Sequence, residues 1–534
     1  MKRVLRWQTA CLFGLMSLWM VASVQAQQPT VVLTIKSVDE LLDDADYIGE
    51  VVGTEGARAT AEQFLGAFTN GQGLAGIDLE KPLGAYWNVT AAGEPEMPVI
   101  FLPIADEDAF QGLIKTLAPD LKDKNGQWTL SVNGQKLFAK LSGGYIFISN
   151  SPDVLTDPAD PQKIVNGKYD IGLDVNIASI PQQLKDLFLA QTEQQGRAGL
   201  ENGPEPKNEA EAKGQQLGFD GTLAVLKAVV NDGELMTIGF DVNSESGLGT
   251  VDFGLSGKSG TDLAKAMTAY GKMKPVFGAV PSADAPFSLV ISHPTTLLLP
   301  HVDELFGAMR DAANAEIEKD PKLAEDADKQ AAKDVAKRLF DIGQATMKSG
   351  ALHSIIVLEE GDDDTVRVIG GTKVAKGDDA GKLFDDILAL SKESPDVAKV
   401  KADVAKHAGA RIHAITPELK DEQSAMFGED AGHLAVRADS LWFSLGGGNL
   451  DALKKALDLS GKAAPKKMAP ISLRVKPATL VTLLESDDEG LIERADALAG
   501  EAGDVMNIEI TPTATGATLH IEFGLDLLKL SVQQ

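Results

Sequence analysis

The chain has 534 residues, of which 44% are hydrophobic, and a formal net charge of −28 at pH 7. A net charge this negative repels nucleic acid and anionic membrane surfaces, and it favours binding of cations or basic partners. The apolar content suffices for packed cores, and the length predicts two or more domains.

Residues 1–26 have the pattern of a secretory signal peptide. Basic residues at positions 2, 3 and 6 precede an apolar run over 10–24, and a small-x-small cleavage sequence ends at Ala26. We therefore predict a periplasmic or secreted mature chain with a formal charge of −28 − 3 = −31. The single cysteine, Cys11, lies inside the signal, so the mature chain has no disulfide. No later run of about 18 apolar residues occurs, which predicts no membrane span in the mature chain.

A strand followed by a helix opens four segments of the chain. In the third copy, Phe287, Leu289 and Ile291 alternate with other residues, which is the period of a strand with one buried face. After Pro294 the apolar residues fall on a helical stripe. Comparable stretches begin near residues 31, 171 and 471, and four copies indicate internal duplication.

Each opening is followed by a second helix or polar stretch and then by a hairpin. The expected hairpin strands lie at 83–89 with 98–103, 236–242 with 251–255, 355–358 with 366–369, and 506–510 with 519–525. Helices near 110–117, 261–273 and 383–390 close the first three segments. Short meanders at 128–148 and 412–445 follow the first and third segments. Asn133-Gly134 in the first meander is a strong hairpin signal.

The spacing between copies supports the duplication. Leu33 and Leu289 differ by 256, whereas later positions in the same two segments differ by 271. Ile171 and Ile471 differ by 300, but the hairpins that follow them differ by 270. Segment two therefore holds about 30 extra residues before its hairpin. Residues 192–216 contain few apolar side chains, so we expect a disordered insertion there.

These patterns predict an α+β fold of duplicated strand-helix-helix-hairpin units, in which antiparallel sheets are covered by helices on one face. We expect a first half over 27–281 and a second half over 282–534, each with a unit, a meander and a unit. Phe253 and Phe523 should occupy equivalent buried positions in the hairpins of segments two and four.

Two glycine-containing stretches resemble anion sites. Gly257-Lys258-Ser259 resembles the end of a phosphate loop, but Asp252 stands where that loop requires glycine, which favours a strand-to-helix turn. The stretch Gly446-Gly447-Gly448-Asn449 lies between a strand and a helix. It could bind an anion, or Asn449 could cap the helix.

Other polar patterns point to no defined chemistry. The acidic stretches 362–364 and 487–489 offer oxygens that calcium prefers, but without EF-hand spacing they favour solvated turns. The histidines have no paired zinc spacing; they include His293, His301, His353, His413 and His520. No Gly-x-Ser-x-Gly elbow occurs. The sequence therefore predicts no catalytic, cofactor-binding or metal-binding residue and no cofactor.

The strand sequence Gly-Gly-Tyr-Ile-Phe-Ile-Ser-Asn at 143–150, the signal peptide and the acidic, repeated mature chain resemble large secreted proteins of planctomycete-type bacteria, whose function is unknown. That resemblance implies export and no particular activity. We expect a non-enzymatic interaction or scaffold protein with an envelope or extracellular protein partner. The alternatives are a carrier of an apolar ligand in a sheet-helix cavity and a secreted hydrolase.

Overall fold

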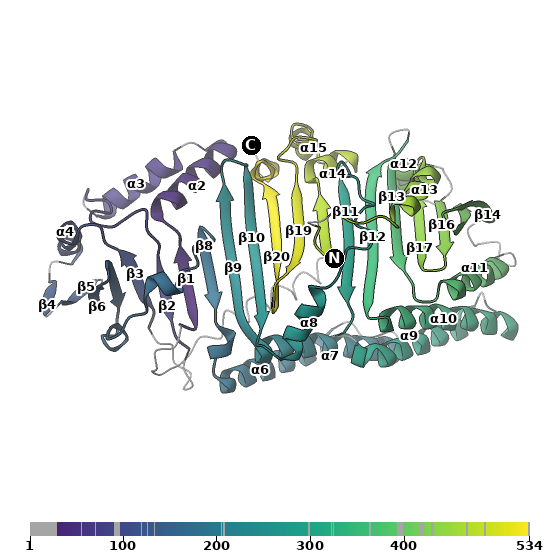
Figure 1. The fold of residues 1–534 in the computed structure, drawn as a ribbon, viewed down its shortest axis with the longest axis horizontal. Helices are drawn as coiled ribbons and strands as arrows, with labels where there is room; N and C mark the ends of the chain where they lie inside the picture. Colours follow the sequence, from purple (N-terminus) through teal and green to yellow (C-terminus); the bar gives the residue numbers. More distant parts are fainter. Residues whose placement is uncertain are drawn as a thin grey trace. The chain divides into compact units, whose positions relative to one another are not determined.

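A computed structural model describes residues 29–531, except for 55, 70, 90–96, 119, 125, 133, 204–205, 207–208, 297–298, 322, 324, 363–364, 392–398, 417–420, 429–431, 466–467 and 485–487. The predicted signal peptide, Asn133 and Asp487 lie outside the described residues. The chain combines helices with antiparallel strands, which confirms the predicted α+β class (Figure 1). No helix in the described part is long and apolar enough to cross a membrane.

The chain forms two compact units. Unit 1 comprises Met1–Gln195, Lys227–Leu263 and His520–Gln534, and unit 2 comprises Gly196–Leu226 and Ala264–Leu519. These bounds differ from the expected halves, because residues 196–226 and 264–281 belong to unit 2 and residues from 520 onward belong to unit 1.

The sheet of unit 1 is antiparallel throughout. In order across the sheet its strands are β4 (Lys122–Lys124), β5 (Gln127–Val132), β6 (Gln135–Ser142), β7 (Tyr145–Ser149), β3 (Val99–Pro103), β2 (Leu83–Trp87), β1 (Val31–Ile35), β8 (Ile171–Val175), β9 (Gly233–Asn243) and β10 (Leu248–Gly257). The last residues of β20 (Gly516–Gly524), from His520 onward, also belong to unit 1.

The sheet of unit 2 has the same order of corresponding strands. They are β14 (Lys399–His407), β15 (Ala410–Thr416), β16 (Gly432–Arg437), β17 (Ser440–Leu445), β13 (Val366–Lys373), β12 (Ala351–Glu360), β11 (Phe287–Pro294), β18 (Ile471–Val475) and β19 (Met506–Pro512). In both sheets the opening strands of two segments pair at the centre, as Leu33 with Leu173 and Leu289 with Leu473 show.

Strand register reproduces the spacing found in the sequence. Each opening strand pairs with the first hairpin strand of its own segment, and the four central pairs are Leu33–Ala85, Leu173–Ile238, Leu289–Ile356 and Leu473–Ile508. The hairpin positions are separated by 356 − 85 = 271 and by 508 − 238 = 270 residues. The four segments therefore share one pairing pattern, and their origin by duplication stays a prediction.

The helices follow the same plan, with two after each opening strand and one after each of the first three hairpins. They are α2 (Val38–Val51), α3 (Ala57–Phe68), α4 (Glu107–Leu117), α5 (Pro161–Ile164), α6 (Gln182–Glu201), α7 (Glu209–Asp232), α8 (Asp262–Tyr270), α9 (Leu299–Lys319), α10 (Asp326–Lys348), α11 (Gly377–Ser391), α12 (Asp421–Phe427), α13 (Asn449–Leu459), α14 (Pro477–Leu483) and α15 (Glu489–Asp496). Short 3-10 turns are η1 (Asp153–Leu155), η2 (Ile177–Ser179) and η3 (Leu525–Leu530).

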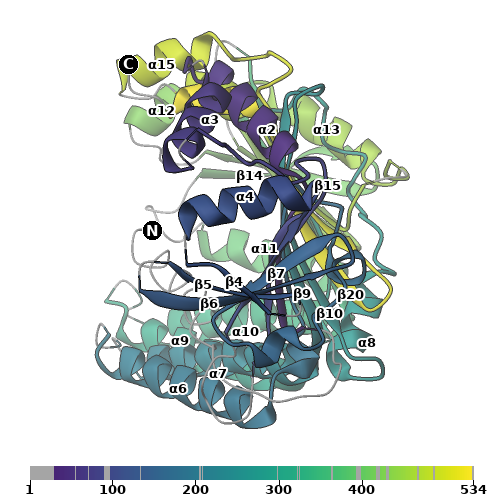
Figure 2. The same cartoon turned by 90° about the vertical axis from the view of Figure 1, so that its left-hand side faces the viewer.

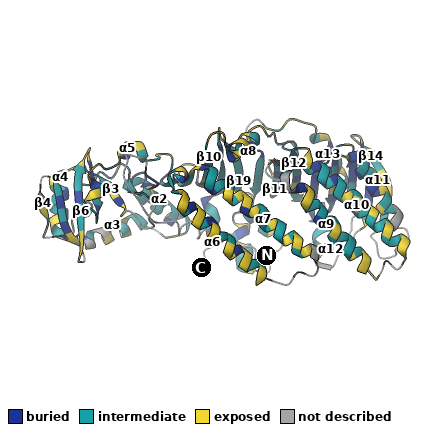
Figure 3. Ribbon diagram, turned by 90° about the horizontal axis from the view of Figure 1, so that it is seen from below, coloured by how far each residue is buried: buried dark blue, intermediate teal, exposed yellow. Residues whose placement is uncertain are grey.

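The expected disorder over 192–216 is wrong wherever these residues are described, because α6 and α7 pass through most of the interval. Glutamine, glutamate, alanine and lysine are good helix formers, and here they propagate two helices. Exposed residues recur along both helices, as in amphipathic helices (Figure 3). Glu193 pairs with Lys227 at 3.1 Å, and the Arg197 guanidinium lies 5.6 Å from the Phe219 ring centre, so contacts between α6 and α7 hold the segment.

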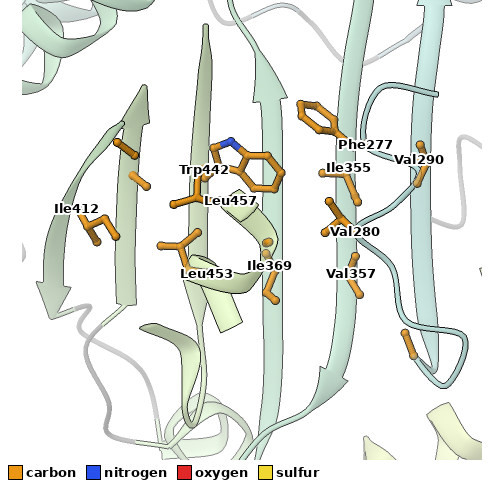
Figure 4. Packing of buried hydrophobic residues seen from close by; sticks show 14 residues of the cluster. Phe277, Val280, Val290, Ile355, Val357, Ile369, Ile412, Trp442, Leu453 and Leu457 are labelled. Atoms are coloured by element: carbon orange, nitrogen blue, oxygen red, sulfur yellow. The ribbon is translucent and has the colours of Figure 1, made fainter. Parts of the chain in front are cut away.

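The largest core lies in unit 2. Trp442 of β17 is fully buried, contacts Phe277 edge-on with ring centres 5.0 Å apart, and packs with Leu453 and Leu457 of α13 (Figure 4). Neighbouring residues such as Val436 point into a second cluster with α10 and α11. Helices therefore cover both faces of β16 and β17, whereas we expected a single covered face.

Candidate functional site

An apolar row crosses one face of the unit 1 sheet, which we call the open face. The row consists of directly paired residues on seven neighbouring strands: Ile148, Ile100, Ala85, Leu33, Leu173, Ile238 and Phe253. Opposed residues of antiparallel strands point to the same side of a sheet. Ile100, Leu33 and Phe253 are 44%, 38% and 37% exposed, and the other four are half-buried. Ile148 packs against the buried cluster beneath α4, so the row is an accessible apolar surface from Ile100 to Phe253.

The opposite face of this sheet is closed. Val32, Tyr86, Phe101 and Phe147 are buried there, and Leu155 packs against them. Successive residues of one strand thus lie in opposite environments, which is the ordinary pattern of a sheet with one buried face.

The prediction that Phe253 is buried is wrong, and Phe523 is only half-buried. In β10 the apolar Phe253 lies on the open face, whereas its neighbour Asp252 is 2% exposed. The Tyr169 ring lies beside the paired glycines Gly172 and Gly239, where side chains would have no room, and so closes the polar side of the strands. Tertiary contacts therefore bury the polar residue of this strand and leave the apolar one exposed, which is the reverse of our expectation.

Helices lie at both ends of these strands. In Figure 1, α2 and α3 lie near the upper ends of β1, β8 and β9, and α6 lies near their lower ends. Figure 2 shows α2 and α3 above and α6 below, on the same side of β9 and β10. The arrangement leaves the middle of the apolar row between the helices, in agreement with the exposure of Leu33 and Phe253.

Asp252 is the centre of a polar cluster on the closed side. Its carboxylate accepts hydrogen bonds from Lys168 Nζ at 2.6 Å and Tyr169 OH at 2.7 Å, and it lies 2.6 Å from His520 Nδ1. Burial alone would raise the pKa of Asp252, but the hydrogen bonds from Lys168, Tyr169 and His520 together lower it. The carboxylate is therefore ionised and fully engaged.

The same geometry argues against nucleophilic catalysis in this cluster. His520 and Asp252 could serve as base and orienting acid, but the cluster's hydroxyl belongs to Tyr169. Burial raises the pKa of Tyr169, whose hydroxyl donates its hydrogen bond to Asp252. The cluster thus anchors the end of β20 and the residues before β8 to β10.

A group of carboxylates lies where α2 meets the end of the sheet. Asp170 Oδ2 accepts from Val242 N–H at 2.7 Å, and Oδ1 lies 3.4 Å from Lys36 Nζ. Burial and the charge of Asp170 raise the pKa of Asp44 to about 7 and that of Asp241 to about 6. Buried Asp44 Oδ2 has no hydrogen-bond partner among the described residues, which disfavours its ionised form.

The glycine-rich loop and the acidic turn, which the sequence presents separately, meet in unit 2. Gly447 N–H donates to Thr365 Oγ1 at 3.1 Å, and the Asp362 carboxylate lies beside Gly448. α13 begins at Asn449 with Gly448 as N-cap, so Asn449 is not the cap. The buried Asn449 side chain instead accepts from Ser444 Oγ at 3.0 Å. The chain's own carboxylate and hydroxyl thus occupy the loop proposed for an anion.

Gly448→Ala is expected to destabilise unit 2 by about 1 kcal/mol, because Gly448 has a φ of 65°. A Cβ there would also lie 2.5 Å from Asp362 Oδ2. Gly461 has no atom within 4 Å of its Cβ position, so Gly461→Ala is the control. Thermal unfolding of the two variants compares them, and equal losses of stability would contradict this account.

The other predicted motifs have structural roles. Lys258 N–H donates to Asp232 O at 2.7 Å in the turn between β10 and α8, as a strand-to-helix turn requires. Asp488 caps α15 by accepting from Leu491 N–H at 3.0 Å. The histidines lie in separate contacts, and no group of three metal-ligating side chains was found among the described residues.

Sequence reasoning missed the apolar row, the Asp252 cluster and the Asp44 group. The alternation in β10 was visible, but it does not say which side is covered. Comparison with protein-family models, with curated proteins and with solved structures finds no match for this chain.

Proposed function

We propose that this protein is an exported, non-enzymatic interaction or scaffold protein that holds an envelope or extracellular partner on the open face of unit 1. The apolar row carries this proposal, since Ile100, Leu33 and Phe253 are each more than a third exposed. Large contiguous apolar surfaces mark interaction sites or ligand grooves. The polar clusters favour a scaffold role, because their donors and acceptors serve the chain's own folding.

A photo-crosslinking amino acid at Phe253 tests this function in the exporting cell. We expect crosslinks to one partner from Phe253 and from Ile100, because both lie in the row. The control is Leu339 of α10, a leucine that is 52% exposed and lies in unit 2. Equal crosslinking from Leu339, or none from the two row positions, would contradict the proposal.

A carrier of an apolar ligand is the second candidate. The same row favours it, because a lipid chain needs a continuous apolar surface and no matching polar groups. Native mass spectrometry of the exported protein distinguishes the two functions. A carrier retains a small molecule that organic solvent removes, whereas a scaffold retains a protein.

A further inference from the structure

Two lysines lie together at the end of β10 without an acidic partner. Lys185 of α6 is 2% exposed, although lysine is rarely buried unless its charge is paired. Lys258 follows β10 directly, and its Nζ donates to Asn231 O at 2.8 Å. Asn231 Oδ1 in turn accepts from Gln182 Nε2 at 3.0 Å, which joins this turn to the first turn of α6.

The pair is unusual in so acidic a chain. Neither lysine forms an ion pair with any described carboxylate. Burial, and then the charge of Lys258, lower the pKa of Lys185 to about 8. A buried cation without a counter-charge is costly, and an anion bound between the two ammonium groups would remove that cost.

The apolar row leads to this pair. Leu255 and Met236 form the next pair on the open face after Phe253 and Ile238, and Lys258 is three residues beyond Leu255. Phe253 and Lys258 are separated by about 17 Å along an extended chain, at roughly 3.3 Å per residue. From Phe253 the row continues across β9 and β8 to Leu33, about 14 Å at the usual strand spacing. A cationic end and an apolar path thus follow one another on this sheet.

We propose that Lys185 and Lys258 bind the carboxylate of a long-chain fatty acid whose chain passes Leu255 and reaches the apolar row at Phe253. This inference rests on the carrier function proposed above. Charge complementarity selects the ligand: the lysine pair attracts a single small anion, and the chain's net charge of −28 repels large polyanions. Leu255, Phe253 and Ile238 accept the chain, since their side chains offer no polar group.

Binding of palmitate and of hexadecanol to the mature chain tests the inference by titration calorimetry. Palmitate carries the charge, and hexadecanol has the same chain without it. Lys185→Met with Lys258→Met should weaken palmitate binding at least tenfold, because two charge-assisted hydrogen bonds are lost, and should leave hexadecanol binding unchanged. Lys115→Met, at an exposed position of α4, is the control and should change neither. Phe253→Asp should weaken both ligands.

The outcomes separate the two proposals. If both probes bind and Phe253→Asp weakens them, but the double lysine variant binds palmitate as wild type does, the row carries apolar ligands and the head-group inference is overturned. If neither probe binds wild type, the carrier function falls as well. Melting temperatures give a second measurement. Lys185→Met should raise the melting temperature without ligand, and palmitate should raise that of wild type but not that of the double variant.

Discussion

Asp252→Ala is expected to lower the free energy of unfolding of unit 1 by about 3 kcal/mol. The substitution removes the acceptor of Lys168, Tyr169 and His520, and it leaves the Tyr169 hydroxyl buried without that partner. Lys168 is largely exposed and can be hydrated again, so the loss falls short of that for a wholly buried ion pair. Asp252→Asn keeps the shape and should cost less.

Phe253→Ala is the matched control, one residue away on the same strand. Because Phe253 is 37% exposed on the open face, its truncation should cost about 1 kcal/mol. Urea unfolding followed by tryptophan fluorescence measures both variants in a Trp442→Phe background. In residues 27–534 the remaining tryptophans, Trp87 and Trp128, then report on unit 1. A larger loss for Phe253→Ala than for Asp252→Ala would refute the assignment of the two faces.

When the pH rises from 5 to 8, the free energy of unfolding of unit 1 is expected to fall by about 2 kcal/mol more in wild type than in the Asp44→Asn variant. The pKa of Asp44 is raised to about 7 in the folded state, from an unfolded value near 3.8. Between these values the folded state holds a proton that the unfolded state has released. The contribution of this bound proton to the free energy of unfolding is present near pH 4 and is lost as the pH rises through 7. At pH 8, therefore, Asp44→Asn should be the more stable protein.

The groups that face Asp44 set the size of this effect. Asp170 and Asp241 approach from the sheet, and Glu40 lies one turn away on α2 beside Lys36. On η3, which packs against α2, Asp526 and Lys529 form their own ion pair. Asp43→Asn is the control, because Asp43 is 69% exposed on the same helix. Urea unfolding at pH 5 and pH 8 checks the prediction, and parallel pH dependences for wild type and Asp44→Asn would contradict it.

The order of elements could be predicted from the sequence because it depends on local patterns. Alternation around Leu289 and Leu473 marks the opening strands, and the spacings of 270 and 271 residues recur in the strand register. The turn at Lys258 also follows from its neighbours alone, since a strand ends and a helix begins there. Such signals need no knowledge of distant residues.

Only the tertiary structure decided which side of each strand is covered and which polar residues meet. Alternation in β10 is equally compatible with burial of Phe253 or of Asp252, and Tyr169 and His520, from distant parts of the chain, decide for Asp252. In the same way, residues 192–216 have a helix-forming composition, but it is the contacts between α6 and α7 that hold the described residues of this segment in place. Lys185 lies near Lys258 because α6 crosses the end of the sheet at that point. These outcomes depend on contacts between residues far apart in the sequence, and no local pattern encodes such contacts.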